Sequence, residues 1–336
     1  MQSYLSDRQH CVAMGGCRST FVTNLTDVPQ GSVLGPFLFF IFTTPVGNII
    51  DSFGVTYHQY ADDTQLYTTI KLSSSDKLAS MSACADAVTS WHLENDVLLN
   101  QNKTEAIITG IRQQIAKFDR SAGVAVAGTN VPFVDKLRVL GVTLDSQLTF
   151  EDHISGVVST CNYHMRALRH IRPLITKEMA NVAACSILCS RLNYCNSVLY
   201  GMIGITAHNI GRLQRVQNSL ARVVCHAPYR SSATLLRQSL HWLPIEARIT
   251  FKILMLTYKV RNHRQPTYLS SMITDYKPAR FLRSAVSDLL VIPRTNTVTA
   301  SRAFRIAAAT VRSCDSINGF RRQLKTHLFD LAYKSP

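Results

Sequence analysis

Hydrophobic and polar residues follow two different patterns along this chain, and the change between them falls near residue 150. In the first part, short segments that alternate with a period of two lie between longer segments whose apolar residues recur every three or four positions. These two periods are typical of strands and helices, so the first part predicts an α+β fold. Helices are expected over 34–50 and 73–98, and strands over 57–70, at 106–109 and in a hairpin at 124–134.

The second part has a mostly helical pattern. Its apolar stripes predict helices over 151–172, 176–199, 209–226 and 244–262. Beyond about residue 265 the chain is richer in proline, serine and arginine and less periodic, so a looser tail is expected there. The pattern therefore divides the chain into three regions, residues 1–150, 151–265 and 266–336.

Charge separates the two parts further. Residues 1–150 hold 10 Lys and Arg against 13 Asp and Glu, whereas residues 151–336 hold 26 against 8, which gives net charges of −3 and +18. A positive field confined to one part of a chain is expected for a protein that contacts a polyanion. Nucleic acid is favoured over an anionic membrane surface, and no membrane partner is expected.

Arginines in two of the predicted helices are candidates for contacts with a phosphate backbone. In the helix at 209–226 the apolar stripe lies on one face and three arginines fall close together on another. A second cluster lies in the helix at 151–172, where His164, His170 and Arg172 accompany two of them. The candidates are Arg166, Arg169, Arg212, Arg215 and Arg222. A solvated helix face is the better explanation for any single one of them, so the prediction depends on the summed charge.

The nine cysteines are scattered, odd in number and not preceded by a secretory signal, which favours reduced thiols in the nucleus or cytoplasm. Cys185, Cys189 and Cys195 lie close enough in sequence to suggest zinc. Their spacing lacks paired Cys-x-x-Cys knuckles, however, and their apolar neighbours favour a buried helix. The apolar run at 33–42 is too short to span a bilayer and is expected in the core.

Two adjacent carboxylates carry the clearest candidate chemistry. Asp62 and Asp63 follow Tyr60-Ala61 between two β-prone segments, so a tight hairpin turn would bring both carboxylates to the same place. Hard cations such as Mg²⁺ bind such oxygens together with substrate phosphates. The alternative is a solvated turn, because Asp-Asp pairs are common in turns.

Further motifs stand on both sides of this pair. Pro29-Gln30-Gly31-Ser32 precedes it, Asn100-Gln101-Asn102-Lys103 and Leu140–Asp145 follow it, and Leu240-His241-Trp242-Leu243-Pro244-Ile245 lies further along. This ordered set resembles the reverse transcriptases of non-LTR retrotransposons, especially jockey-like and CR1-like elements, over most of the chain. Each motif alone is a weak signal, but their shared order is a strong one.

The resemblance implies a partial polymerase palm, an antiparallel sheet with helices, over residues 1–150. A mostly helical, thumb-like basic region at 151–265 and a basic C-terminal tail region at 266–336 would follow. It also implies RNA-templated DNA synthesis by two-metal nucleotidyl transfer, with an RNA template and a DNA primer as partners and Mg²⁺ or Mn²⁺ as cofactor. Several carboxylates hold the two ions about 4 Å apart in such chemistry.

Residue by residue, the resemblance makes Asp62 a direct metal ligand and Asp63 its support, and it places Tyr60 beside the primer end. Lys103 matches a lysine near the triphosphate that could protonate or neutralise the leaving group. An ordinary exposed lysine in a turn is the alternative. The remaining matches are Gln30 and Gly31 for template and incoming nucleotide, and Leu140, Gly141 and Val142 for the primer grip.

One departure from the family pattern is serious. Another aspartate, on a strand before the Gln30 loop, completes the family's metal site, and neither Asp7 nor Asp27 has the aromatic-x-Asp context of that strand. The fingers also precede that loop in the family. We therefore expect a chain truncated on its N-terminal side, with a metal site that works only if it is completed, and with little or no polymerisation on its own.

Two other outcomes stay open at this stage. The chain could be a non-catalytic RNA- or DNA-binding module, whose affinity falls steeply with salt. It could also be an inactive relic of an element that folds poorly. A complete element polymerase is a further candidate partner, since it could supply the missing strand.

Overall fold

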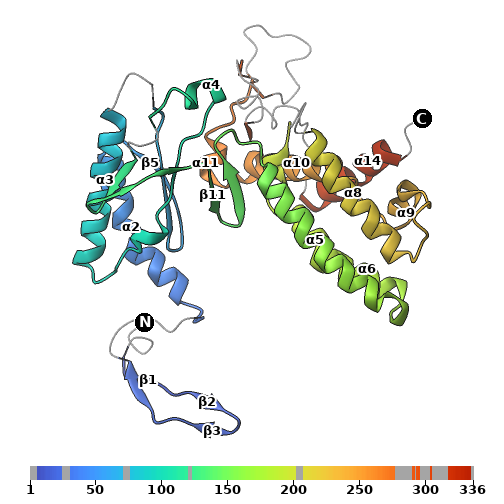
Figure 1. Ribbon diagram of the computed structural model, residues 1–336, viewed down its shortest axis with the longest axis horizontal. Helices are drawn as coiled ribbons and strands as arrows, with labels where there is room; N and C mark the ends of the chain where they lie inside the picture. Colours follow the sequence, from blue (N-terminus) through green and yellow to red (C-terminus); the bar gives the residue numbers. More distant parts are fainter. Residues whose placement is uncertain are drawn as a thin grey trace. The chain divides into compact units, whose positions relative to one another are not determined.

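The computed structural model describes residues 6–24, 31–70, 76–119, 123–201, 207–276, 290–291, 293–295, 303–304 and 317–333. The chain forms two compact units, Met1–Val134 and Asp135–Pro336, each with its own elements (Figure 1). The hairpin at 136–145 and the helix that follows it belong to the second unit. The predicted boundary at residue 150 stays a prediction.

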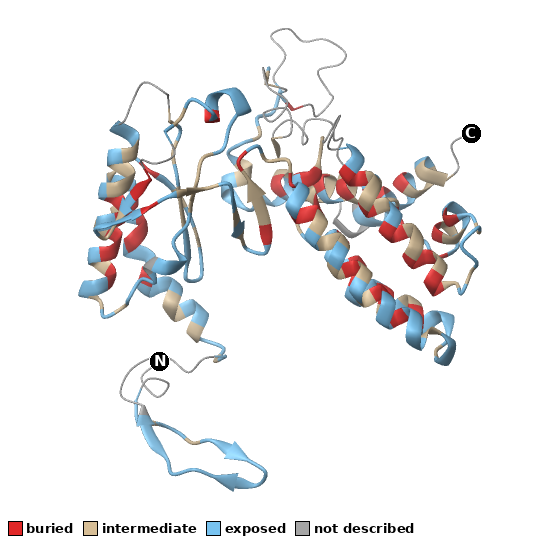
Figure 2. Cartoon of the chain, viewed as in Figure 1, coloured by how far each residue is buried: buried red, intermediate tan, exposed pale blue. Residues whose placement is uncertain are grey.

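The first unit begins with a long β-hairpin. Strand β1 (Arg8–His10) pairs antiparallel with β4 (Val22–Asn24), and β2 (Ala13–Met14) pairs with β3 (Cys17–Arg18) around the Gly15-Gly16 turn. Ser19 connects the two pairs, because its hydroxyl accepts a 2.9 Å hydrogen bond from the Val12 N–H. Most of this hairpin is exposed (Figure 2).

Two helices and a second hairpin form the core of the first unit. Helix α2 (Gly35–Ser52) begins with a proline in its first turn, where a missing N–H is tolerated, and helix α3 (Asp76–Glu94) packs against it. The hairpin joins β5 (Thr56–Tyr60) to β6 (Asp63–Tyr67). The core of the first unit consists of apolar residues from α2, α3 and the segment before β5: Val46, Ile50, Val55, Cys84 and Val88.

Short elements complete the first unit. A 3₁₀ turn, η1 (Gln101–Lys103), precedes β7 (Ala106–Ile107), which pairs in parallel with β10 (Phe133–Val134); α4 (Arg112–Ile115) lies between them in sequence. Strands β8 (Val124–Val126) and β9 (Thr129–Val131) form the expected hairpin. Helix α3 holds it through Asp86, whose Oδ1 accepts a 2.7 Å hydrogen bond from the Ala127 N–H.

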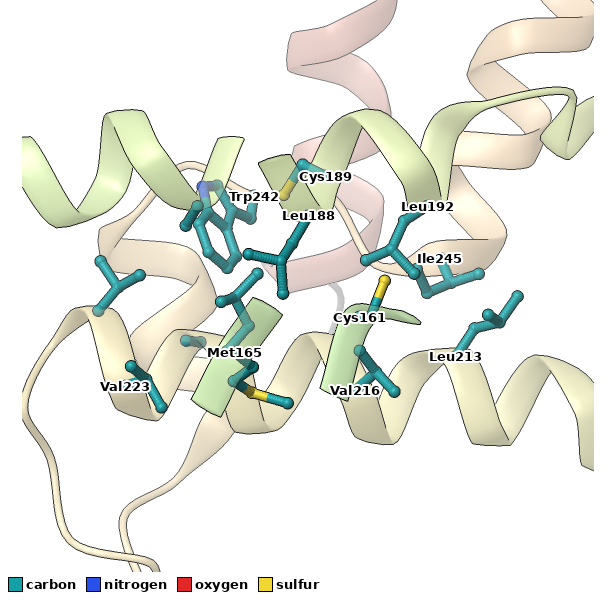
Figure 3. Packing of buried hydrophobic residues seen from close by; sticks show 14 of the residues in the cluster. Cys161, Met165, Leu188, Cys189, Leu192, Leu213, Val216, Val223, Trp242 and Ile245 are labelled. Atoms are coloured by element: carbon teal, nitrogen blue, oxygen red, sulfur yellow. The ribbon is translucent and has the colours of Figure 1, made fainter. Parts of the chain in front are cut away.

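The second unit is mostly helical. It opens with the hairpin of β11 (Lys136–Val139) and β12 (Val142–Asp145), and then α5 (Glu151–Ile171) packs against α8 (Ala207–Val224). Two shorter helices, α9 (Ala233–Ser239) and α11 (Thr267–Ser270), come before and after α10 (Ile245–His263) in sequence. Figure 3 shows the core of this unit, which includes Met165, Leu188, Val216 and Trp242.

The prediction of a single helix over 176–199 is wrong. The structure divides this segment into α6 (Lys177–Ala183), a π-helical turn, η4 (Ala184–Cys189), α7 (Ser190–Asn193) and a 3₁₀ turn, η5 (Asn196–Leu199). The helical path is broken after α7, because Tyr194 is extended and Cys195 adopts a positive φ of 48°. The π turn has only six residues, which is too short to change the apolar period of the segment.

The prediction of a looser tail beyond residue 265 is wrong for residues 317–333. Residues Ile317–Tyr333 form a helix, α14, which packs on α10. Leu324 and Leu328, four positions apart, are buried there against Leu243 and Tyr258. This i, i+4 pair is the signal in the sequence that could have predicted the helix.

The mixture of helices and small two-stranded sheets is compatible with the predicted α+β class. The helices predicted near 34–50, 73–98, 151–172, 209–226 and 244–262 are confirmed. In the described part of the chain, every helix is too short or too polar to cross a bilayer.

Candidate functional site

The two adjacent aspartates lie at a tight hairpin turn, as the sequence predicts. Tyr60 ends β5 and pairs with Asp63, which begins β6, so only Ala61 and Asp62 form the loop. Ala61 adopts a positive φ of 52°, which such short loops require. Both carboxylates are exposed to solvent, so a ligand can reach them without any rearrangement of the core.

The register decides which side chains accompany them. Residues paired across a hairpin share a face, so Tyr60 and Asp63 lie on the same face as His58 and Tyr67, while Tyr57 and Leu66 lie on the other. Tyr57 and Leu66 pack against the core of the first unit. The turn is therefore fixed from behind by apolar contacts, and the face with Asp63 is left open.

Tyr57 contacts α2 closely at Gly47. A β-carbon at position 47 would collide with the hydroxyl and Cζ of Tyr57, so only glycine permits this approach. The glycine lies inside a helix, where it is otherwise unfavourable. This contact sets the distance between α2 and the hairpin that carries the aspartates.

His58 and Tyr67 are neighbours of the site that sequence reasoning missed. The Tyr67 hydroxyl and the His58 Nε2 atom are 3.1 Å apart, and the two ring centroids are 5.2 Å apart. Both are exposed on the face that carries Tyr60 and Asp63. The period-two alternation of residues 56–60 was the available signal, since it places residues 56, 58 and 60 together.

The donor chemistry of the turn fits a hard divalent ion. Carboxylate oxygens are the ligands that Mg²⁺ and Mn²⁺ take in proteins. Within the described ranges, no group of three or more His, Cys, Asp or Glu side chains is placed to hold a metal ion. The two carboxylates of the turn are fewer than the several that a pair of ions uses.

The other residues predicted around the aspartates are only partly described. Lys103 ends η1 and is exposed. Gly31 adopts a positive φ of 83°, a conformation that favours glycine, and a β-carbon there would meet open space. Gln30 lies outside the described residues. No distance links these residues to the turn.

Leu140 and Gly141 form the two-residue turn of the β11–β12 hairpin, and Val142 is the first, buried residue of β12. Both turn residues have positive φ, 46° and 81°, as expected for a tight turn that matches the twist of its strands. Tyr194 supports this turn, because its hydroxyl donates a 2.6 Å hydrogen bond to the Leu140 carbonyl. Its ring lies against Gly141, with Cε1 3.4 Å from the position of an added β-carbon.

Asp145, at the end of the same motif, connects the hairpin to α5. Its Oδ1 accepts hydrogen bonds from the N–H groups of Gln147 and Thr149, and its Oδ2 accepts from the Thr149 hydroxyl and, at 2.7 Å, from the Phe150 N–H. One carboxylate thus accepts hydrogen bonds from three backbone N–H groups of the 146–150 loop. This use is structural, and the sequence motif alone did not distinguish it from a catalytic one.

The predicted phosphate-binding arginines fall into two groups. Arg166, Arg169 and Arg215 are exposed. Arg212 is half-buried and donates to Ser155 Oγ at 2.9 Å and to Asn209 Oδ1 at 3.2 Å. Arg222 donates to the Ser231 carbonyl at 3.2 Å and lies 5.4 Å from the centre of the Tyr229 ring.

Arg212 and Arg215 line the same shallow depression between α5 and α8, whereas Arg222 lies near the end of α8. Arg172, which the sequence places beside Arg166 and Arg169, donates to three backbone carbonyls, of Val223, Val224 and Ile175. It therefore fixes the end of α8 and is a structural residue.

The segment at 240–245 is held to α8 by buried amides. Gln217 is completely buried and donates a 2.8 Å hydrogen bond to the Leu243 carbonyl, while Gln214 accepts from the Ile245 N–H at 2.9 Å. Trp242 fills the core beside them, and its carbonyl accepts a 2.6 Å hydrogen bond from the Tyr333 hydroxyl. This motif thus joins α8, α10 and α14 in the second unit.

Comparisons with known proteins agree with these motifs. Residues 1–144 match the family model described as "Reverse transcriptase (RNA-dependent DNA polymerase)". The chain is 26% identical over 295 residues to the probable RNA-directed DNA polymerase from transposon BS of Drosophila melanogaster, covering 84% of this chain and 31% of that protein.

Two further relatives come from mobile elements. The RNA-directed DNA polymerase from mobile element jockey of Drosophila melanogaster is 31% identical over 163 residues, covering 47% of this chain and 17% of that protein. The retrovirus-related Pol polyprotein from type-1 retrotransposable element R1 of Nasonia vitripennis is 25% identical over 229 residues, 65% of each chain. This chain thus spans less than a third of the first two relatives. No solved structure gave a significant match.

Proposed function

We propose that this chain takes part in RNA-templated DNA synthesis, because its first 144 residues match the reverse transcriptase family model and its relatives are RNA-directed DNA polymerases of mobile elements. The observation that carries the proposal is the tight β5–β6 turn, which presents Asp62 and Asp63 together, exposed and fixed from behind by Tyr57 and Leu66. The template would be RNA and the primer DNA.

Asp62 is the proposed direct metal ligand, and Asp63 the residue that shares or supports it. When bound, Mg²⁺ supplies Lewis-acid activation of the primer hydroxyl and stabilisation of the leaving pyrophosphate. Tyr60 shares the exposed face of Asp63 and is 65% exposed, so its ring is available to the primer end. Aromatic rings that contact a nucleic-acid end do so by stacking on a base or sugar.

Lys103, Gln30 and Gly31 are proposed to contact the incoming nucleotide and the template. The exposed ammonium of Lys103 would neutralise or protonate the leaving group. The positive φ of Gly31 supports the proposal that backbone approaches the ligand there, since a side chain is disfavoured in this conformation. Gln30 precedes it directly.

The turn of Leu140, Gly141 and Val142 is the proposed primer grip, and the helical region at 151–265 is the proposed thumb. Support of the turn by the Tyr194 hydroxyl gives it a fixed shape. Arg166, Arg169 and Arg215 are proposed to contact the phosphate backbone, because they are exposed on helices of the part with a net charge of +18. Arg212 and Arg222 already donate hydrogen bonds within the protein, so only their remaining N–H groups would contact phosphate.

We expect the purified chain to extend a primer weakly or not at all on its own. Two carboxylates are fewer than two-metal chemistry uses, and no third lies with them among the described residues. A complete element polymerase could supply the missing ligand as a partner.

Primer extension tests the proposal. The purified chain would be given an RNA template, a DNA primer, deoxynucleotides and Mg²⁺ or Mn²⁺. Whatever extension occurs should be lost in Asp62→Asn/Asp63→Asn and retained in Asp51→Asn, a matched control on the exposed end of α2. Extension that persists in the double variant would contradict the role of the turn.

A non-catalytic nucleic-acid-binding module is the second candidate. It is favoured by the segregation of positive charge. Residues 1–150, with a net charge of −3, hold the two aspartates, and residues 151–336, with a net charge of +18, hold the arginines. This candidate predicts that Asp62→Asn leaves primer–template affinity unchanged with and without Mg²⁺. The polymerase predicts that Mg²⁺ strengthens binding of the incoming nucleotide in the wild-type chain and does not do so in the variant.

A further inference from the structure

A shallow depression lies at the exposed edge of the contact between α5 and α8. The two helices pack side by side (Figure 1), and the buried part of their contact is apolar and includes Cys161 and Leu213. At the exposed edge, the short side chains of Val158, Asn162 and Ser219 leave space between the helices. The depression has a volume of about 230 Å³ and is lined by Val158, Asn162, Arg212, Arg215, Val216 and Ser219.

Arg212 reaches this depression in a fixed orientation. It donates to Ser155 Oγ of α5 at 2.9 Å and to Asn209 Oδ1 at 3.2 Å. Asn209 is only 4% exposed, so this acceptor is itself held in place. A guanidinium presents its N–H donors in one rigid plane, and these two bonds use only some of them. A ligand can therefore bind to the remaining donors with little further loss of side-chain freedom.

The lining carries two positive charges and no negative one. Arg215 lies about one turn beyond Arg212 on α8 and is exposed, while Asn162 and Ser219 add an amide and a hydroxyl. Guanidinium groups bind phosphate oxygens through charge-assisted hydrogen bonds, and amides and hydroxyls also donate to such oxygens. The polar part of the depression thus fits a phosphate group.

The depression also has an apolar part. Val158 and Val216 line it beside the polar groups. A bare anion would leave this apolar surface uncovered, whereas the sugar next to a phosphate in a nucleic-acid strand would cover it with its C–H groups. The combination of guanidinium donors and an apolar wall therefore fits a sugar–phosphate unit better than a free anion.

We propose that this depression binds one sugar–phosphate unit of a nucleic-acid strand. Arg212 and Arg215 bind the phosphate oxygens, Asn162 and Ser219 add hydrogen bonds, and the sugar packs on the two valines. The inference rests on the proposed function and deepens it, because it assigns one phosphate of the bound strand to a defined place on the second unit. Such a contact is distinct from the attraction of the summed charge.

A dinucleotide tests the proposal without template, metal or polymerisation. Thymidylyl-thymidine has one phosphodiester between two sugars, and the full chain is titrated with it at low ionic strength. In NMR spectra, the Nε–H signals of Arg212 and Arg215 and the methyl signals of Val158 and Val216 should shift with one common dissociation constant. Unchanged arginine signals would overturn the proposal, and so would arginine shifts without valine shifts.

Dimethyl phosphate is the matched probe, because it has the same charged diester group and no sugar. It should shift the arginine signals, bind more weakly than the dinucleotide and leave the valine methyl signals in place. Equal affinity for the two probes would show that the depression takes any phosphate anion, which contradicts the proposed sugar contact.

Three variants separate the site from diffuse charge. Arg215→Gln changes an exposed side chain and should raise the Kd for the dinucleotide about tenfold, the loss expected for one charge-assisted hydrogen bond. Arg212→Lys keeps the charge but loses the planar fork, so it should also weaken binding. Arg191→Gln, an exposed arginine of the same unit outside the depression, is the control and should leave the Kd unchanged. Equal weakening by Arg215→Gln and Arg191→Gln would overturn the proposal.

This titration and primer extension can fail separately. If the chain extends a primer while the dinucleotide leaves the four signals unchanged, the depression is not a binding site and the proposed polymerase function stands. If the four signals shift and no extension occurs, the depression is confirmed as a sugar–phosphate site and only the polymerase function loses support.

Discussion

At the scale of single residues, close contacts explain positions that the sequence left ambiguous. Position 47, inside α2, is a glycine because the Tyr57 ring leaves no room for a β-carbon there. Tyr57 lies on the inner face of the hairpin that carries Asp62 and Asp63 at its turn. The position of the two carboxylates therefore depends on a glycine that has no chemistry of its own.

Gly47→Ala should destabilise the first unit. The added methyl group would collide with the ring of Tyr57, and overpacking of this kind costs about 1–3 kcal/mol, more than the roughly 1 kcal/mol that alanine gains over glycine in a helix. The midpoint of thermal unfolding should fall. Gly156→Ala, in α5 with open space around the added carbon, should leave the midpoint unchanged or raise it.

The same contact gives a coupling test. Tyr57→Phe removes the hydroxyl nearest to the added carbon, so Gly47→Ala should cost less in that background than in the wild-type chain. Additive effects of the two substitutions would show that Tyr57 is not the residue that excludes alanine.

At the scale of elements, periodicity predicted most helices because their apolar stripes are long. α5, α8 and α10 each keep several buried residues at helical spacing, and the predicted bounds differ from the observed ones by a few residues. The prediction of one helix over 176–199 failed because a positive φ at Cys195, which a cysteine rarely adopts, breaks the helical path. Helix α14 was missed because its buried stripe is narrow.

The site was predicted as far as local pattern allows. The β5–β6 turn and the Leu140–Gly141 turn follow from residues adjacent in sequence, so motif spacing was sufficient. The supports of these turns come from distant residues, Gly47 for one and Tyr194 for the other, and single-sequence patterns do not record such pairs. The same holds for Arg172, since two of its three acceptors, the carbonyls of Val223 and Val224, lie 51 and 52 residues away.

Asp145 gives the prediction at this scale. Asp145→Ala removes four hydrogen bonds to the loop that joins β12 to α5, and it should destabilise the second unit by about 1–3 kcal/mol. Urea unfolding measures the loss. Asp152→Ala is the matched control, because its exposed pair with Lys136 at 3.4 Å is worth at most about 1 kcal/mol. Equal losses would show that Asp145 does not act as a loop cap.

At the scale of the whole molecule, charge and chemistry are divided between the two units. The aspartate turn lies in the first unit, and the exposed arginines lie on helices of the second. Binding of a primer–template should therefore depend on the second unit, while metal should depend on the first.

Salt dependence measures the contribution of the arginines. Affinity for a primer–template should fall steeply with ionic strength, and Arg166→Gln/Arg169→Gln should reduce the slope of log K against log salt concentration by about 2, roughly one for each lost phosphate contact. Arg112→Gln, an exposed arginine of the first unit, is the control and should leave the slope unchanged. An unchanged slope in the double variant would show that Arg166 and Arg169 of α5 do not contact the phosphate backbone.

The central claim, that the β5–β6 turn holds a catalytic metal, is tested most directly by Mn²⁺, which takes the same oxygen ligands as Mg²⁺ and broadens the NMR signals of nearby nuclei. With primer–template bound, we predict that Mn²⁺ broadens the backbone amide signals of Tyr60 to Asp63. Asp62→Asn/Asp63→Asn should abolish this broadening and Asp51→Asn should not. Unchanged signals from Tyr60 to Asp63 in the bound wild-type chain would contradict the claim.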